Sequence, residues 1–213
     1  MENVTLNLLK NKKVLVTGGS GFIGINLIME LLKEGAIVTA LDLPMTNWEK
    51  IPFGVRLVKA DILKKSDLIN VCDDIEIIYH LAAKTDLDGK TKNDYKVNYE
   101  GTQNLIEEAA KSQTLERFVF YSTFLVAGES NETRFIDETE PYRTKTVYGE
   151  SKIEGEKIVK KCCSQFNIPF TIIRPTSVYG PWGGTPYREF FQTIKKNDIS
   201  MLGKLITSSV GYM

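Results

Sequence analysis

The sequence predicts an α/β fold in which a doubly wound parallel sheet carries helices on both faces. Three observations lead to this prediction. Short apolar runs rich in β-forming residues alternate with longer stretches of helical periodicity. A glycine-rich segment, Thr17 to Gly24, joins the first run to the first helical stretch, and Asp42 closes the second run. Alternation of strands and helices in this way is typical of parallel sheets with right-handed crossovers.

Six apolar runs are the expected strands. They are Lys13 to Thr17, Ala36 to Leu41, Val55 to Ala60, Glu76 to Leu81, Arg117 to Tyr121 and Phe170 to Ile173. The expected helices are Phe22 to Glu34, Asn98 to Lys111, about Val147 to Cys163, and a last stretch around Tyr187 to Lys196. Two polar stretches, Lys84 to Asp94 and Glu129 to Thr146, follow strands. We therefore expect both at the carboxyl edge, where open α/β sheets bind ligands.

Length and composition limit the classes of function. A chain of 213 residues can bury one good core, or one domain and part of another. Its formal net charge of zero argues against nucleic acid or an anionic membrane surface as the main partner. Its three cysteines fit neither a disulfide framework nor a zinc site, so we expect no metal. Met1 to Lys10 lacks the features of a signal peptide, and no apolar run approaches the ~20 residues of a membrane span. We expect a cytoplasmic protein.

The glycine-rich segment has the pattern of a phosphate-binding turn. Its glycines, Gly18, Gly21 and Gly24, allow a tight turn and let backbone N–H groups approach a pyrophosphate at the helix N-terminus. A carboxylate at Asp42 can accept hydrogen bonds from an adenosine ribose and repel a 2′-phosphate, which favours NAD over NADP. The alternatives are a glycine turn without a ligand and an ordinary aspartate at a strand end.

Tyr148 and Lys152 are four residues apart in the last long helical stretch, so their side chains lie on one face. A phenol, with a pKa near ~10, is a poor base at neutral pH. A cation held close to it favours the phenolate and lowers the pKa. This pair therefore predicts a general base beside a redox cofactor, although a Tyr and a Lys at this spacing also occur by chance on exposed helices.

Seven motifs occur in order along nearly the whole chain. They are Thr17 to Gly24, Asp61-Ile62, His80-Leu81-Ala82-Ala83, Asn98 with Gly101, Thr102 and Asn104, Ser122-Thr123, Tyr148 with Lys152, and Arg174-Pro175 through Val178-Tyr179-Gly180-Pro181. In these motifs the chain resembles the extended short-chain dehydrogenase/reductase family, and in particular its NAD-dependent epimerase/dehydratase group.

The resemblance implies a Rossmann-type NAD-binding domain over residues 1–180. It also implies the start of a substrate-binding lobe over residues 181–213, with Gly203 to Met213 leading toward a part that is largely missing. A homodimer through Asn98 to Lys111 and Val147 to Cys163 is expected by analogy. The residues implied for NAD binding are Gly18, Gly21, Phe22, Ile23, Gly24, Asp42, Asp61, Ile62, Leu81, Ala82, Ala83, Asn98, Tyr148, Lys152, Pro175 and Val178.

Individual roles follow from the same resemblance. Asp61 is expected to take the adenine amino group, with Ile62 against the ring. His80, the only histidine, is expected to be structural, and Ala82 and Ala83 to be small because the cofactor passes close to their backbone. Asn98 is expected to support the catalytic helix through hydrogen bonds.

The resemblance implies a catalytic set of Thr123, Tyr148 and Lys152. Tyr148 would take the substrate's hydroxyl proton, while Lys152 would lower the pKa of Tyr148 and bond the nicotinamide ribose. Thr123 would bond the substrate oxygen, and Ser122 is the competing assignment. Hydride would pass from the carbinol carbon to NAD.

Three departures from the family pattern bear on the substrate. Dehydratases of the family carry an Asp-Glu pair where this chain has Phe124-Leu125, so we do not expect this chain to be a dehydratase. Ser177 replaces an Asn that approaches substrate phosphates in many nucleotide-sugar enzymes. Ala127 replaces a frequent Tyr.

Three hypotheses therefore remain open. The first is an NAD-dependent oxidoreductase or epimerase that acts on a small molecule, with a nucleotide sugar as the leading class. The second is an alcohol dehydrogenase or ketone reductase of the same family with a small apolar, steroid-like or flavonoid-like substrate. The third is a catalytically silent NAD-binding module.

Overall fold

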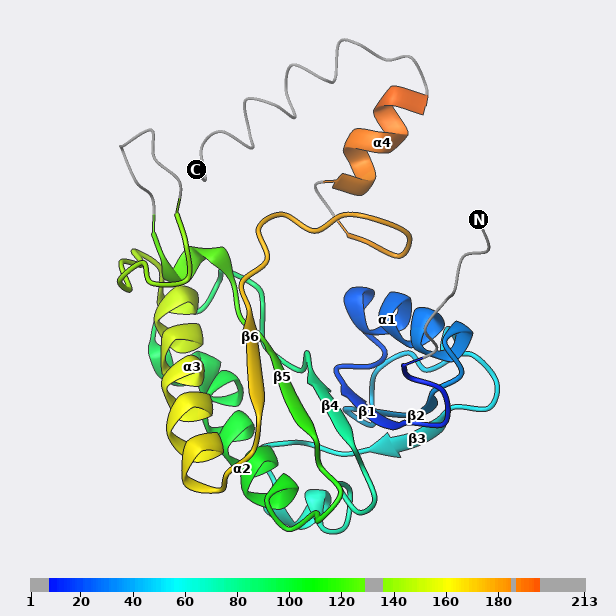
Figure 1. The fold of residues 1–213 in the computed structure, drawn as a ribbon. Helices are drawn as coiled ribbons and strands as arrows, with labels where there is room; N and C mark the ends of the chain where they lie inside the picture. Colours follow the sequence, from blue (N-terminus) through cyan, green and yellow to red (C-terminus); the bar gives the residue numbers. More distant parts are fainter. Residues whose placement is uncertain (1–7, 129–135, 185–186, 196–213) are drawn as a thin grey trace, which may run out of the picture. The chain divides into compact units, whose positions relative to one another are not determined.

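The computed structural model describes residues 8–128, 136–184 and 187–195, and these form two compact units with a boundary between Thr176 and Ser177. The first unit is a six-stranded parallel sheet with the order β3-β2-β1-β4-β5-β6 (Figure 1). The succession of strands reverses direction between β1 and β4, as it does in Rossmann-type sheets. The predicted doubly wound α/β fold is therefore confirmed.

The six strands lie within one residue of their expected bounds. They are β1 Lys13–Thr17, β2 Ile37–Asp42, β3 Arg56–Lys59, β4 Ile77–His80, β5 Arg117–Tyr121 and β6 Phe170–Ile173. The α-helices are α1 Phe22–Lys33, α2 Glu100–Ala109, α3 Val147–Gln165 and, in the second unit, α4 Tyr187–Lys195. Three 3-10 turns, η1 Lys65–Leu68, η2 Lys92–Asn98 and η3 Phe124–Val126, complete the elements.

The expected start of the second helix at Asn98 is wrong. Asn98 ends the 3-10 turn η2, and Tyr99, with φ −127° and ψ −49°, separates that turn from α2. The kink turns the Asn98 side chain toward α3, where it forms a hydrogen bond with Ser151. A regular helix that began at Asn98 would have continued the periodicity of α2 instead.

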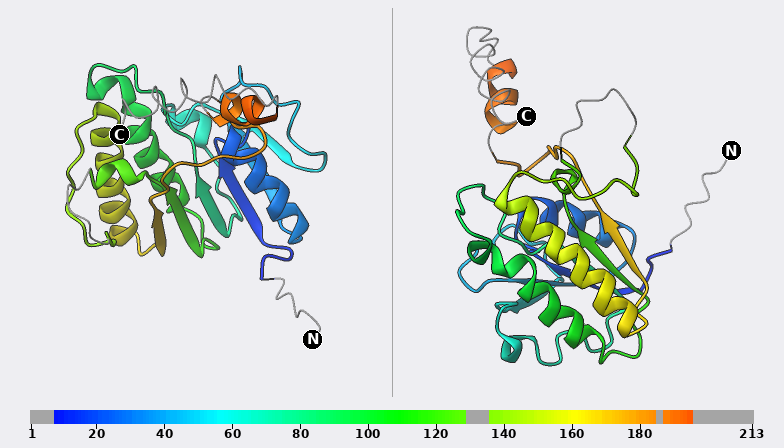
Figure 2. Two further views of the ribbon diagram at one scale, coloured as in Figure 1. Left: turned by 90° about the horizontal axis from the view of Figure 1, so that it is seen from above. Right: turned by 90° about the vertical axis from the view of Figure 1, so that its left-hand side faces the viewer.

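Helices cover the sheet on two faces, each with its own apolar core (Figures 1 and 2). On one face α1 packs against β1 and β2, with a core of Val14, Val16, Ile28, Leu31, Ala36, Val38 and Ala40. On the other face α2 and α3 lie side by side, over a larger core that includes Leu15, Ile78, Leu105, Ile106, Phe118 and Val159. Neighbouring residues of β1 point to opposite faces, as the strand period of two requires.

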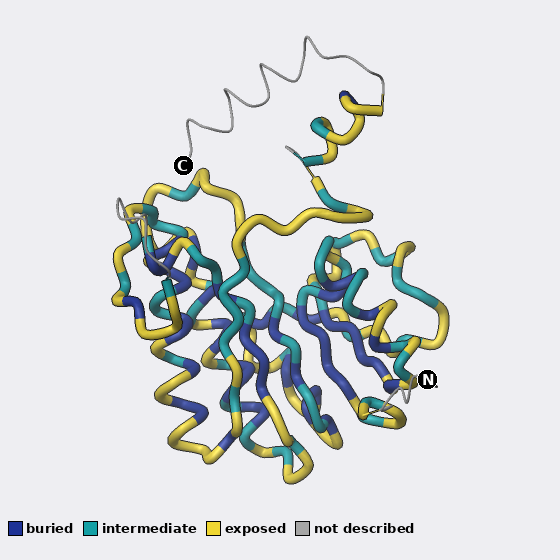
Figure 3. Tube along the Cα trace, turned by 45° about the horizontal axis from the view of Figure 1, so that its top comes forward, coloured by how far each residue is buried: buried dark blue, intermediate teal, exposed yellow. Residues whose placement is uncertain are grey.

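Burial is greatest along the central strands, and exposure rises at the strand ends and connections (Figure 3). Several segments for which the sequence made predictions lie outside the described residues. They are residues 1–7, residues 129–135 of the polar stretch Glu129 to Thr146, Lys196, and Gly203 to Met213. The expected domain boundary after Gly180 stays a prediction. No helix within the described ranges has the length and apolar character that crossing a bilayer would require.

Candidate functional site

The turn after β1 requires glycine at two positions, because a side chain there would clash with the backbone. Gly18 has φ +69°, and a Cβ there would lie 2.8 Å from the backbone nitrogen of Ala82, which follows β4. A Cβ at Gly24 would collide with the carbonyl oxygen of Gly18. Gly21 precedes α1 without capping it through a side chain, so the N–H groups of the first turn have no side-chain acceptor. Together these features give an open backbone cradle for an anion, which fits the pyrophosphate of a dinucleotide.

Asp42 lies at the end of β2, beside this turn. Its Oδ2 accepts hydrogen bonds from Ser20 N, at 3.0 Å, and Ser20 Oγ, at 2.7 Å, and its Oδ1 accepts one from Leu43 N at 2.8 Å. The carboxylate thus fixes the glycine turn. Since a carboxylate offers about four acceptor positions, one remains for a ribose hydroxyl. The side chain is half-buried, with room for that contact.

Asp61 and Ile62 follow β3 and differ in burial, because Asp61 is half-buried and Ile62 is buried. Asp61 Oδ1 accepts a hydrogen bond from Leu63 N at 3.0 Å, which closes a short turn and leaves Oδ2 free of any contact that the structure records. The Ile62 side chain is only 3% exposed and fills the space above Gly101 on α2. The Ile62 side chain thus packs into the core, and the expected contact of this residue with an adenine ring stays a prediction.

His80, at the end of β4, is structural, as expected. It is 1% exposed, and its Nδ1 and Nε2 lie 2.7 Å and 2.9 Å from Thr17 Oγ1 and Thr102 Oγ1. Thr102 donates its own proton to the Asn98 carbonyl, so its oxygen must accept from His80 Nε2–H, and Thr17 must donate to Nδ1. Burial, and next the charge of Lys152, lower the pKa of His80 to about 3. The imidazole is therefore neutral and has a partner on each nitrogen.

The segment after His80 lies directly against the glycine turn. Leu81 N donates to Thr17 O at 3.1 Å, and Ala82 N donates to Thr17 Oγ1 at 3.2 Å. Leu81, Ala82 and Ala83 are each half-buried. Their backbone thus borders the cradle that Gly18 opens, as the cofactor assignment requires, although the contact itself remains a prediction.

Asn98 forms a hydrogen bond with α3, the helix that carries Tyr148 and Lys152. Its Nδ2 donates to Ser151 Oγ on α3 at 2.9 Å and to Lys84 O at 3.0 Å, while its Oδ1 accepts from Lys84 N at 2.8 Å. Ser151 in turn donates to the Tyr148 carbonyl at 2.6 Å. Asn98 is only 1% exposed, so its side chain holds other elements in place and has no surface left for a cofactor.

Lys152 is a buried cation on α3. It is 3% exposed, its Nζ donates to the Tyr121 carbonyl at 2.6 Å, and it lies 4.3 Å from the centre of the Phe120 ring. The ammonium is thereby held at the end of β5, two residues before Thr123. Burial lowers the pKa of Lys152 to about 7, while the negative charge of Glu156 acts in the opposite direction. An ammonium has three donors, so two remain beyond the Tyr121 bond.

Tyr148 lies one turn before Lys152, but its pKa is shifted opposite to the expectation. Burial, and next the proximity of Tyr95, raise the pKa of Tyr148 to about 12. The two tyrosine rings lie 5.9 Å apart between centroids. Lys152 does not lower this pKa, because its ammonium is directed to the Tyr121 carbonyl and the Phe120 ring. In this arrangement the phenol stays protonated at neutral pH.

Ser122 and Thr123 compete for one role, and their contacts separate them. Ser122 is 5% exposed and donates its hydroxyl to Glu156 Oε1 at 2.6 Å. Thr123 is half-buried, and its Oγ1 only accepts a hydrogen bond, from Leu125 N at 3.3 Å, as the cap of η3. The Thr123 proton therefore remains available to a substrate oxygen, whereas the Ser122 hydroxyl is used inside the protein.

Two residues in this region escaped the sequence reasoning. Tyr95 is fully buried, and its hydroxyl joins the Asp86 carbonyl to the Gly89 amide at 2.9 Å and 3.0 Å. Glu156, also fully buried, lies one turn beyond Lys152. A Lys and a Glu four apart are usually an exposed ion pair, so no signal in one sequence distinguishes Glu156. The contact between the rings of Tyr95 and Tyr148 depends on the fold alone.

The last two expected cofactor residues lie on either side of the boundary between the units. Pro175 belongs to the first unit, is half-buried, and its carbonyl accepts a hydrogen bond from Phe124 N at 2.9 Å. Val178 belongs to the second unit and is 40% exposed. Among the residues that the structure describes, no three His, Cys, Asp or Glu side chains gather as a metal ion would need.

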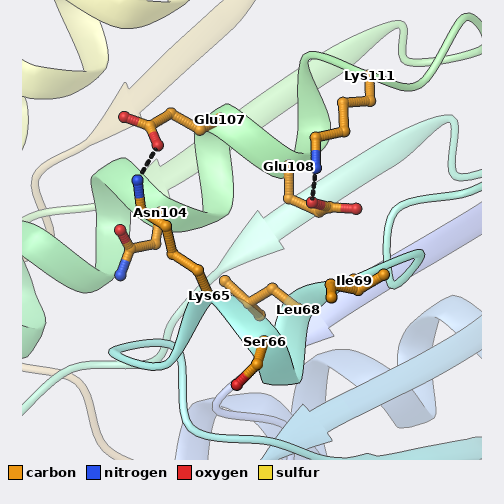
Figure 4. Close-up of a pocket in the computed structure, with 8 residues that line it drawn as sticks. All are labelled: Lys65, Ser66, Leu68, Ile69, Asn104, Glu107, Glu108 and Lys111. Atoms are coloured by element: carbon orange, nitrogen blue, oxygen red, sulfur yellow. Dashed lines mark hydrogen bonds and ion pairs between the residues drawn. The ribbon is translucent and has the colours of Figure 1, made fainter.

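A separate cavity of about 350 Å³ lies between η1 and α2 (Figure 4). It is lined by Lys65, Ser66, Leu68, Ile69, Asn104, Glu107, Glu108 and Lys111. Its two lysines are already paired, Lys65 with Glu107 at 2.6 Å and Lys111 with Glu108 at 2.5 Å. None of the predicted catalytic or cofactor residues lines it, so it is not part of the candidate site.

Comparison with known proteins points to one family. The family described as "NAD dependent epimerase/dehydratase family" matches residues 14–205. The chain is 31% identical over 199 residues to a 3-beta-hydroxysteroid dehydrogenase of Mycolicibacterium neoaurum, with 89% of this chain and 54% of that enzyme covered. It is also 31% identical to the human dTDP-D-glucose 4,6-dehydratase, with 80% and 51% covered.

Among solved structures, the UDP-glucose 4-epimerase of Thermus thermophilus in complex with NAD is similar. It matches with a TM-score of 0.73 and 29% identity, over 82% of this chain and 58% of that one. The chain thus spans about half the length of the curated relatives it matches.

Proposed function

The chain belongs to the NAD-dependent epimerase/dehydratase family, within the extended short-chain dehydrogenases/reductases, and from this premise we propose that it binds NAD and transfers hydride between a substrate carbinol and this cofactor. The chain spans only 54% of that steroid dehydrogenase and 58% of the matched epimerase structure, so the proposal concerns the part of the site that this chain carries. A nucleotide sugar is the leading substrate class.

The observation that carries the proposal is the position of the Lys152 ammonium. It is buried at the end of β5, bonded to the Tyr121 carbonyl, beside Thr123 and one helical turn from Tyr148. Burying a cation is costly unless it is paired or hydrogen-bonded, and titratable groups perturbed in this way cluster at functional sites. The glycine turn opens at the same edge of the sheet, where Gly18 touches Ala82.

Each residue then has a definite task. The N–H groups at the start of α1 bind the pyrophosphate, and Asp42 receives the adenosine ribose and disfavours NADP. Lys152 donates to the nicotinamide ribose, and Thr123 donates to the substrate oxygen. NAD, when bound, accepts or returns the hydride.

Tyr148 exchanges the proton of the substrate hydroxyl in this proposal. Oxidation breaks the O–H and the carbinol C–H bonds, and the proton passes to Tyr148 Oη; reduction reverses both transfers. Because burial raises the pKa of Tyr148 to about 12, the phenol is ready to donate, and acting as a base requires a positive charge beside Oη.

The substitution Tyr148→Phe tests this assignment. We expect the affinity for NAD, measured by calorimetry, to stay within about 3-fold, while hydride transfer falls by roughly 10²- to 10⁴-fold. Turnover of a 3β-hydroxysteroid is followed by NADH absorbance, and turnover of UDP-glucose and dTDP-glucose by product analysis, because an epimerase returns the hydride to its substrate and accumulates no NADH. Equal losses of binding and turnover would make Tyr148 structural, and no NAD binding by the unaltered chain would contradict the proposal.

A second candidate is oxidation of a small apolar carbinol. It is favoured by the similarity to a 3-beta-hydroxysteroid dehydrogenase and by Ser177 and Ala127, which depart from the nucleotide-sugar pattern. The same panel separates the two candidates, because turnover of the steroid without turnover of either nucleotide sugar supports the second one.

A further inference from the structure

Glu156 is a buried carboxylate on α3 to which the motifs assign no role. It is fully buried and accepts four hydrogen bonds. Ser122 Oγ and Arg174 Nε donate to its Oε1, at 2.6 Å and 2.9 Å. Tyr142 Oη and an Arg174 Nη donate to its Oε2, at 2.9 Å and 2.7 Å. Both oxygens are therefore fully used, and the bidentate pair with Arg174 fixes the plane of the carboxylate.

These bonds join the segments that carry the proposed catalytic residues. Ser122 directly precedes Thr123 after β5, and Arg174 directly precedes Pro175 after β6. The two segments also pair with each other, since Ser122 N donates to Ile173 O at 2.8 Å and Phe124 N donates to Pro175 O at 2.9 Å. Glu156 thus fastens both strand ends to the helix that carries Tyr148 and Lys152.

Glu156 also lies one helical turn from Lys152, on the same helix. The charged and titratable groups around Lys152 come from each neighbouring element. They are His80 on β4, Tyr121 on β5, and Tyr148 and Glu156 on α3, and Glu156 is itself bonded to Arg174 and Tyr142. His80 is neutral, and burial raises the pKa of Tyr121 and Tyr148, so Glu156 is the negative charge that acts on Lys152.

We propose that Glu156 is a positioning residue of the hydride-transfer site, which keeps the Lys152 ammonium charged and holds the Ser122–Thr123 corner against α3. Burial alone favours the neutral amine form of Lys152, which has fewer N–H donors than the charged ammonium form. The carboxylate opposes that effect across one turn of the helix. This inference rests on the proposed function only for what the ammonium binds.

The test measures the charge of Lys152 directly. The side-chain carbon signal of Lys152, assigned with Lys152→Arg, is followed by NMR against pH in the 213-residue chain. In Glu156→Gln we expect the titration midpoint to fall by about one pH unit or more relative to the unaltered chain. Tyr142→Phe is the matched control. It removes one hydrogen bond from Glu156 and keeps the charge, so the midpoint should not move.

Glu156→Gln leaves the half-buried Arg174 without its carboxylate partner, which destabilises the fold, so a second variant is needed. The double variant Glu156→Gln/Arg174→Gln removes both charges, and we expect the Lys152 midpoint to fall in it as well, because Glu156, and not Arg174, is the charge that acts on Lys152. A folded variant of either kind with an unmoved midpoint would overturn the proposal. So would an equal shift in Tyr142→Phe.

The affinity for NAD at several pH values gives the second readout. In Glu156→Gln the pH at which NAD binding weakens should follow the Lys152 midpoint downward. If the unaltered chain does not bind NAD, the proposed function fails while the NMR titration still tests Glu156. If NAD binds and the midpoint does not move, Glu156 alone is wrongly assigned.

Discussion

The glycine turn after β1 and the corner around Lys152 lie at the same edge of one sheet but are constructed differently. In the turn, Gly18 and Gly24 are required because any side chain would collide with backbone atoms. In the corner, His80, Lys152 and Glu156 are polar side chains that are almost completely buried. The first region depends on backbone conformation, and the second depends on hydrogen bonds between side chains that are distant in sequence.

This difference explains what each region reveals in the sequence. The backbone conformation of the turn can be formed only with glycine at certain positions. The turn can therefore be predicted from glycines that lie close together in the sequence. The hydrogen-bond network of Ser122, Glu156 and Arg174 cannot be predicted in this way. Its residues are common types that are far apart in sequence and meet only in the folded chain. The following predictions test whether the two regions behave as differently as they are built.

The largest effect is expected at Gly18. In Gly18→Ala, the positive φ and the contact with Ala82 N should together cost about 2–4 kcal/mol of folding free energy and greatly weaken NAD binding. Gly54→Ala is the matched control, because Gly54 has φ +90° but nothing within 4 Å of a Cβ. It should cost only about 1 kcal/mol. Urea unfolding measures both, and equal costs would show that the approach of Ala82 does not constrain the turn.

A smaller effect is expected from the buried histidine when pH is lowered. The pKa of His80 is about 3 in the folded chain and near 6.5 in the unfolded one, so below pH 6.5 only the unfolded chain gains the proton. Stability should therefore fall with pH, by about 2 kcal/mol from this group on reaching roughly pH 5. Because His80 is the only histidine, its imidazole NMR signals are unambiguous. A folded-state titration near 6.5 would show that the network does not keep His80 neutral.

The smallest effect concerns the hydroxyl of Tyr95. Tyr95→Phe keeps the ring beside Tyr148 but removes the hydrogen bonds to Asp86 O and Gly89 N, which should cost about 1–2 kcal/mol. The loss should appear as faster amide exchange in the loop from Lys84 to Gly89, with the glycine turn unchanged. Tyr99→Phe serves as the control on an adjoining segment. Faster exchange in the glycine turn as well would show that the two regions are not independent.

Most of the fold could be predicted from the sequence. The six strands were found because buried parallel strands form short continuous apolar runs, and the glycine turn fixed where β1 ends and α1 begins. The start of α2 could not be found in this way. Tyr99 leaves helical geometry because Asn98 is held by Lys84 and Ser151, and those partners are known only from the tertiary structure.

The site was predicted in part. The sequence indicated Gly18, Asp42, Thr123, Tyr148 and Lys152, and the structure places them at the carboxyl ends of β1, β2 and β5 or on α3. It could not indicate the pKa of Tyr148, because burial and the orientation of Lys152 depend on packing. The burial of Ile62 could not be predicted for a similar reason, since Gly101 leaves a space in the core that its side chain fills.

The hydrogen bonds through His80 limit which substitutions the sequence can accept at these positions. Ala82 N–H donates to Thr17, Thr17 to His80, His80 to Thr102, and Thr102 to the Asn98 carbonyl, so every proton points the same way along the series. A substitution that reverses or removes one donor leaves the next group without its proton or its acceptor. Thr17, His80 and Thr102 are therefore expected to be inherited or replaced as a set, and a homologue that has changed one of them should have changed its neighbours in the series too.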